Sequence, residues 1–150
     1  MTPAVDPYYP TPLHPLHALL LAGSLPLFLG TLLSDITYYN TYQIQWSNFA
    51  SWLLAGALLL SGLALLCALI GLFRRDRRQG PALMYFVMLL AAWILGFFNA
   101  LIHARDAWAI MPGALVLSVL VTILALAAVW LGLFSLRDGG VRGETPSSSG

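Results

Sequence analysis

The chain has 150 residues, of which 59% are hydrophobic and only 9% are charged. Soluble domains are about one quarter charged, so this composition excludes a soluble enzyme and a disordered protein and indicates a multi-pass membrane protein. Seven arginines, six acidic residues and no lysine leave a net charge of +1, which provides no basic surface for nucleic acid. The single cysteine, Cys67, cannot form an intrachain disulfide.

Four apolar segments are long enough to cross a bilayer as helices, which takes about 20 residues each. In chain order they are residues 12–38, 48–73, 81–103 and 112–136. Ser47 or Asn48 is the predicted N-cap of the second helix. The sequence therefore predicts a proline-rich head at 1–11, a four-helix transmembrane domain at 12–136 and a disordered tail at 137–150.

The arginines predict the orientation of these helices. Six of the seven lie in the loop after the second segment or follow the fourth segment, whereas only Arg105 lies in the third loop and none lies in the first. Because positive residues accumulate on the cytoplasmic side, we expect both termini to be cytoplasmic.

Small residues recur every three or four positions in three of the segments, and such stripes let transmembrane helices pack closely. They are Ala57, Ser61, Ala64, Ala68 and Gly71 in the second, Ala92, Gly96 and Ala100 in the third, and Ala114, Ser118, Ala125, Ala128, Gly132 and Ser135 in the fourth. The pattern predicts an all-α fold, an antiparallel four-helix bundle with a left-handed twist. The same stripes could also pair two copies as a homo-oligomer.

A first group of candidate ligands lies near the start of the first helix. His14 and His17 are three residues apart and share one face of a helical turn. Met84 and Met88 of the third helix lie at a similar depth. Two imidazoles and two thioethers could hold copper, and one His–Met pair could ligate haem. Alternatively, the histidines bond headgroups or loop carbonyls, and the methionines fill the core.

A second group lies at the opposite membrane face. Asn99, His103 and Asp106 are expected on one face of the third helix, with Arg105 beside them and Asp35 of the first helix at the same level. Ionisable groups at membrane depth mark functional sites. This group could bind a quinone, relay protons or dock a partner, and the Asn99 amide is expected to orient the His103 ring. The alternative is a structural clasp between the first and third helices, for instance Asp35 with Arg105.

The positions of the histidines restrict which residues could ligate a haem iron. His17 and His103 lie near opposite membrane faces, about 30 Å apart, and the third histidine, His14, shares a helix with His17. One copy therefore cannot ligate a haem through two histidines, and would need His–Met ligation or a second subunit. Phosphate-binding glycine loops and hydrolase motifs are not found in the sequence.

Several stretches carry a family resemblance. They are His14-Pro15-Leu16-His17, Ser34-Asp35, Gln45-Trp46-Ser47-Asn48-Phe49, the run Asn99-Ala100-Leu101-Ile102-His103-Ala104-Arg105-Asp106-Ala107-Trp108, then Pro112-Gly113 and Leu117-Ser118. Over residues 12–136 the chain resembles a bacterial family of membrane proteins, domain of unknown function 2231, although Ala18 stands where many members have proline. The resemblance implies four helices in the bacterial inner membrane. Because some members occur beside or fused to Rieske-type or quinoprotein redox modules, it also implies a link to electron transfer.

These observations favour an accessory or anchor subunit of membrane electron transfer, with bound haem, copper or quinone. Its expected partners are the lipid bilayer and a periplasmic or membrane redox protein. The alternatives are a non-catalytic scaffold or docking subunit and, with less support, a small-solute transporter, since a pair of broken helices is missing. The sequence does not decide whether the protein is an enzyme.

Overall fold

The computed structural model describes residues 15–74 and 80–137. Its elements are α1 (Pro15–Thr41), α2 (Ile44–Arg74), α3 (Gly80–His103), the short 3-10 helix η1 (Ala107–Ala109) and α4 (Gly113–Arg137). All four α-helices are long and apolar enough to span a membrane, and the described residues contain no strand. The all-α, four-helix prediction is therefore confirmed.

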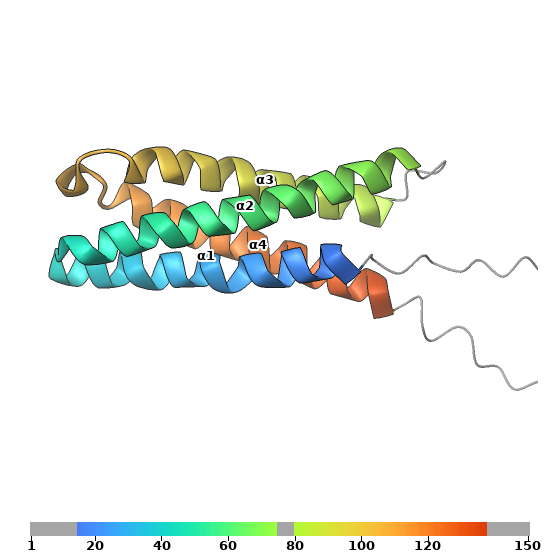
Figure 1. Cartoon of the computed structure of the whole chain (residues 1–150), viewed down its shortest axis with the longest axis horizontal. Helices are drawn as coiled ribbons and strands as arrows, with labels where there is room; N and C mark the ends of the chain where they lie inside the picture. Colours follow the sequence, from blue (N-terminus) through green and yellow to red (C-terminus); the bar gives the residue numbers. More distant parts are fainter. Residues whose placement is uncertain (1–14, 75–79, 138–150) are drawn as a thin grey trace, which may run out of the picture.

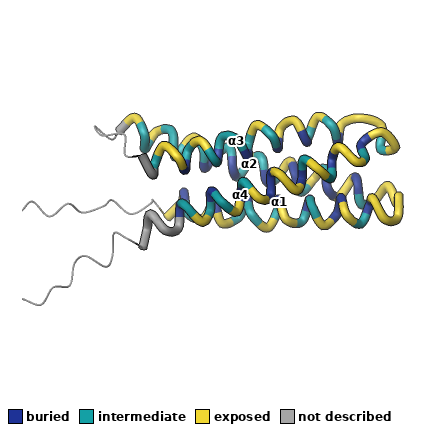
Figure 2. The backbone as a smooth tube through the Cα atoms, turned by 180° about the vertical axis from the view of Figure 1, so that it is seen from behind, coloured by how far each residue is buried: buried dark blue, intermediate teal, exposed yellow. Residues whose placement is uncertain are grey.

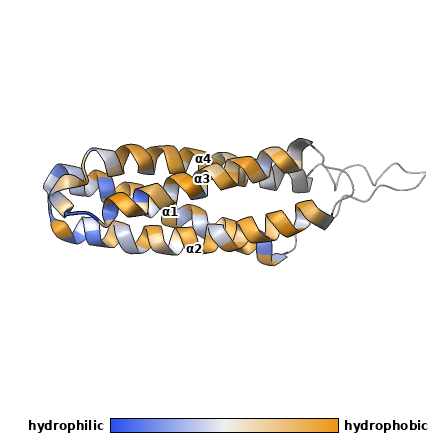
Figure 3. Cartoon of the chain, turned by 90° about the horizontal axis from the view of Figure 1, so that it is seen from above, coloured by the Kyte–Doolittle hydropathy of each residue, from blue (hydrophilic) through white to orange (hydrophobic). Residues whose placement is uncertain are grey.

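The four helices form an antiparallel bundle in which each contacts its chain neighbours and α4 closes against α1. Figure 1 shows the α1–α2 turn and the α3–α4 connection at one end of the bundle, with the start of α1 and the end of α4 at the other. We call the first of these the polar end, because hydrophilic residues gather there while apolar residues cover most of the helix length (Figure 3). The candidate site lies at the polar end.

The predicted small-residue stripes form much of the helix packing, although a Cβ on Gly71 of the α2 stripe would meet no atom within 4 Å. Ala57, Ala64, Ala92, Ala114 and Ala128 are all fully buried, since a small side chain lets neighbouring backbones approach. Exposed positions occur along every helix (Figure 2), and many of them are large apolar side chains. An outer face of this kind is suited to contact with lipid acyl chains.

The junction between α1 and α2 is shorter than the sequence predicted. α1 continues to Thr41 and α2 begins at Ile44, so Ser47 lies inside α2 and the predicted N-cap there is wrong. Tyr42 makes this two-residue connection possible by adopting a positive φ of 52°, and its N–H donates to the carbonyl of Tyr38 at 2.7 Å. The tighter turn places the first turns of α2 directly beside the end of α1.

Candidate functional site

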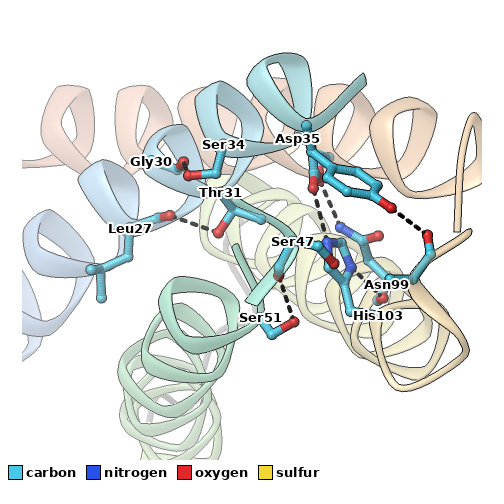
Figure 4. Close-up of polar contacts among 12 residues, drawn as sticks. Leu27, Gly30, Thr31, Ser34, Asp35, Ser47, Ser51, Asn99 and His103 are labelled. Carbon is cyan, nitrogen blue, oxygen red and sulfur yellow. Dashed lines mark hydrogen bonds and ion pairs between the residues drawn. The ribbon is translucent and has the colours of Figure 1, made fainter. Parts of the chain in front are cut away.

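Four polar side chains from three helices form one hydrogen-bonded group at the polar end, which we call the clasp. It consists of Asp35 of α1, Asn99 and His103 of α3, and Ser118 of α4. Asp35 Oδ1 lies 2.9 Å from His103 Nε2, as Figure 4 shows. Asp35 Oδ2 accepts a hydrogen bond from Ser118 Oγ, which in turn accepts one from Asn99 Nδ2 at 2.8 Å. All four residues are at least nine-tenths buried, so the clasp joins α1, α3 and α4 inside the bundle.

The hydrogen-bond partners define the charge state of the clasp. His103 Nδ1 lies 3.0 Å from the backbone carbonyl oxygen of Asn99, and Nε2 faces the Asp35 carboxylate. Nδ1 therefore donates to this carbonyl, and the one proton between Nε2 and Asp35 lies either on the ring or on the carboxyl group, so the pair carries no net charge in either case. The clasp is therefore neutral overall and has no free ring nitrogen.

The single hydrogen of the Ser118 hydroxyl also determines how Asn99 is oriented. Because Ser118 donates to Asp35, Asn99 must donate to Ser118 through Nδ2. Asn99 Oδ1 is then buried with no hydrogen-bond partner in the described part of the chain. An unpaired buried carbonyl costs about 1–3 kcal/mol, which the charged bonds of the clasp must offset.

The structure differs from the sequence prediction in the position of Arg105 and Asp106 and in the partner of Asp35. It suggested Arg105 as the partner of Asp35, whereas the structure pairs Asp35 with His103. Because α3 ends at His103, Arg105 and Asp106 lie beyond the helix, are exposed, and do not share the face that carries Asn99. Asn99 does orient the His103 ring, but through its backbone carbonyl rather than its side-chain amide.

The connection between α3 and α4 is attached to α1 through buried contacts. The Tyr38 hydroxyl donates to the carbonyl of Ala107 at 2.8 Å, and Ile110 packs against Tyr38 with 1% of its surface exposed. The ring of Tyr42 stacks on Trp108, with centroids 6.2 Å apart and planes 11° apart. These contacts attach the connection to the end of α1 at the polar end.

Three side chains of this connection point outward, and we call them the platform: Arg105, Asp106 and Trp108. All three are exposed, Trp108 by 72%. Asp106 precedes η1 but makes no capping hydrogen bond with its side chain. The platform thus offers a cation, an anion and an indole on a connection that is itself well fixed.

A cavity of about 380 Å³ adjoins the clasp between the first turns of α2 and the end of α3. Its volume falls within the range of small-ligand sites, about 300–1,000 Å³. Its lining is mainly polar and contains no carboxylate: Ile44, Gln45, Ser47, Asn48, Ser51, His103, Arg105 and Ala107. We call it the polar pocket.

The inner group of candidates is arranged around a partner that the sequence did not suggest. His17 Nε2 lies 2.8 Å from the hydroxyl oxygen of Tyr85, and both residues are buried. Met88 packs against the cluster that contains Tyr85, whereas Met84 is 52% exposed. His14 lies outside the described residues. The structure therefore brings His17 to Tyr85 and leaves Met84 on the outer surface.

The described residues contain no group of three or more His, Cys, Asp or Glu side chains that could hold a metal ion. The set proposed from the sequence combined histidines with methionine thioethers, so copper and haem at His17 and Met88 stay predictions. Their test is a reduced-minus-oxidised visible spectrum of the purified protein with metal analysis of the same sample.

Sequence reasoning missed three contributors to these sites. Ser118 was used as a small residue of a packing stripe and in a family motif, Ser47 as a helix cap and in a family motif, and neither they nor Tyr85 were assigned to a site. For Ser118 and Tyr85 a signal was present, because each is a hydroxyl-bearing residue within an apolar segment, at the depth of an ionisable side chain.

The fold defines a multi-pass membrane protein with four transmembrane helices. Residues 13–142 match the family model described as "Predicted membrane protein (DUF2231)", and the chain therefore belongs to that family. No curated protein matches the chain. No solved structure matches it either.

Proposed function

We propose that this protein is an accessory membrane subunit that anchors a redox partner through the platform at its polar end. The observation that carries the proposal is the attachment of the α3–α4 connection to α1 through Tyr38, Tyr42 and Ile110, while the platform side chains are exposed. Exposed residues on a fixed connection suit recognition, because little conformational entropy is lost when a partner binds. An exposed tryptophan and an exposed arginine are also residue types enriched at interface hot spots.

The clasp favours anchoring over catalysis. Both ring nitrogens of His103 and both carboxylate oxygens of Asp35 already have partners inside the protein. A general acid or base must reach the proton that it transfers, and here each polar atom of the pair is bonded elsewhere. The clasp therefore acts as a structural bond between helices that keeps the platform in position.

The link to electron transfer rests on the family resemblance. Because some members occur beside or fused to redox modules, the partner we propose is such a module, and any haem, copper or quinone would be bound by the assembly. This is an argument from association, and the purification experiment below tests it directly.

The proposed location is the bacterial inner membrane, with both termini in the cytoplasm and the platform on the outer face. Support comes from the arginine distribution, since the segments after the second and fourth helices carry six of the seven arginines. In a Cys67→Ser background, Asn40→Cys should react with a membrane-impermeant maleimide in intact cells. Ser148→Cys should react only after lysis. The opposite labelling pattern would reverse the proposed topology.

Anchoring is tested by purifying the tagged protein from native membranes in mild detergent. We expect a redox centre of a second polypeptide, detected by visible difference and electron paramagnetic resonance spectra, in near-stoichiometric amount. Trp108→Ala and Asp106→Arg should each weaken retention of the centre about thirtyfold, because loss of an interface hot spot costs about 2 kcal/mol or more. Asn40→Ala, an exposed change at the same end, should leave retention unchanged. Equal retention by all variants, or purification without any redox centre, would contradict the proposal.

A further inference from the structure

One hydroxyl at the wall of the polar pocket has no hydrogen-bond partner in the part of the chain that the structure describes. Ser47 lines the pocket and is only 6% exposed, and its hydroxyl oxygen is not among the fully buried unpaired atoms, so it opens onto the pocket. The neighbouring Ser51 hydroxyl differs, because it donates to the Ser47 carbonyl at 2.9 Å (Figure 4). The Ser47 hydroxyl is therefore a donor that is available to an acceptor bound in the pocket.

The electrostatics of the polar pocket favour an anionic acceptor. Arg105 lines it and has no salt-bridge partner among the described residues. The pair of His103 and Asp35 carries no net charge, and no carboxylate lines the pocket. The first turn of α2 also lies along it, contains no acidic residue, and presents the positive end of a helix dipole. Together these leave a net positive, hydrogen-bond-donating cavity.

The depth of the pocket suggests where its ligand comes from. The pocket lies between the start of one membrane-spanning segment at Ile44 and the end of another at His103. The ends of such segments lie in the headgroup region of a bilayer. Phosphate is the common anionic group of that region, and arginine with helix N-terminal N–H groups is a standard combination for binding it.

The geometry points to a phosphate-binding site in the polar pocket, in which Arg105 and the Ser47 hydroxyl hold the phosphate group of a phospholipid headgroup or of a soluble phosphate. Both residues donate hydrogen bonds to phosphate oxygens, and the α2 N-terminus adds favourable charge. His103 contributes the wall of the pocket rather than a donor, since both ring nitrogens are bonded within the clasp. Arg105 belongs to both the platform and the pocket, whereas Ser47 belongs to the pocket alone, so Ser47→Ala is the variant that separates phosphate binding from the proposed anchoring.

The test uses the full chain in a phosphate-free maltoside detergent. One arm adds phosphatidylglycerol and measures retained lipid by native mass spectrometry, and the other titrates inorganic phosphate and measures the thermal shift. We expect one tightly held phosphate-bearing ligand, with affinity reduced about tenfold in Ser47→Ala and in Arg105→Gln. A response to phospholipid alone assigns the headgroup as ligand, and competition by inorganic phosphate assigns the soluble anion.

Asp106→Asn is the matched control, because it changes the net charge beside Arg105 without altering a residue that lines the pocket. Its affinity for the phosphate-bearing ligand should equal that of the unaltered protein. Binding that follows net charge, rising in Asp106→Asn as it falls in Arg105→Gln, would overturn the site. So would equal affinity in all variants, or no binding in either arm, with circular dichroism confirming that each variant is folded.

Discussion

Replacement of Asp35 by alanine is the perturbation that probes the clasp most strongly. The carboxylate accepts hydrogen bonds from His103 and from Ser118 and has no exposed surface. Hydrogen bonds to charged groups contribute about 1.5–3 kcal/mol each, so two of them correspond to about 3–6 kcal/mol. Breaking a buried ion pair by removing one partner costs about 3–5 kcal/mol, in agreement with this range. We therefore expect Asp35→Ala to lower the free energy of unfolding by about 3–5 kcal/mol.

The assay is reversible unfolding in mixed micelles, followed by circular dichroism as the denaturing detergent is increased. Thr37→Ala is the matched control, because Thr37 is half-buried and its hydroxyl bonds at the surface to a carbonyl of its own helix, so its loss should cost less than about 0.5 kcal/mol. Ordinary polar contacts between transmembrane helices average about 0.6 kcal/mol. A loss below about 1 kcal/mol for Asp35→Ala would show that the pair is no stronger than such a contact and would refute the reasoning.

Two further predictions concern packing and the inner pair. Tyr85→Phe leaves the buried Nε2 of His17 without its partner and should cost about 1–3 kcal/mol in the same assay; an unchanged unfolding midpoint would contradict the contact. A Cβ on Gly62 would lie 2.9 Å from Nε1 of Trp93, so Gly62→Ala should destabilise the bundle by up to about 2 kcal/mol. Gly71→Ala meets no atom within 4 Å and should be neutral or stabilising by up to about 1 kcal/mol, so equal effects of the two alanines would rule out the packing explanation.

The helices could be predicted from the sequence because their signal is strong and local. Long apolar runs determine the spans, and the small residues, such as Ala57 and Ala128, mark the buried faces. The helix ends were less accurate. α2 begins four residues before the predicted Asn48, because Tyr42 adopts a left-handed conformation that its backbone bond to Tyr38 and its stacking on Trp108 both support.

The candidate site could be predicted in composition but not in pairing. The sequence pointed to Asp35, Asn99 and His103, and the structure brings all three together. The suggested partner of Asp35 was Arg105, as an example of a structural ion pair at the same level, whereas the actual partner depends on where α3 ends. Residues after His103 are no longer helical and so do not follow the face that carries Asn99. The spacing of residues in a sequence does not show at which residue a helix ends. Ser118 was missed because it comes from α4, and only the packing of α4 against α1 brings it to Asp35.

The central claim is that the clasp is a structural bond and not a reacting group, and the double variant Asp35→Leu with His103→Leu tests it most directly. Replacing a buried ion pair by apolar residues of similar volume is often neutral or stabilising, and the Ser118 hydroxyl can bond instead to a carbonyl of its own helix. The account predicts that the double variant unfolds within about 1 kcal/mol of the unaltered protein and retains its redox partner with unchanged electron-transfer rate. A double variant that is equally stable and yet loses that rate tenfold or more would contradict the account, because the pair would then take part in the chemistry.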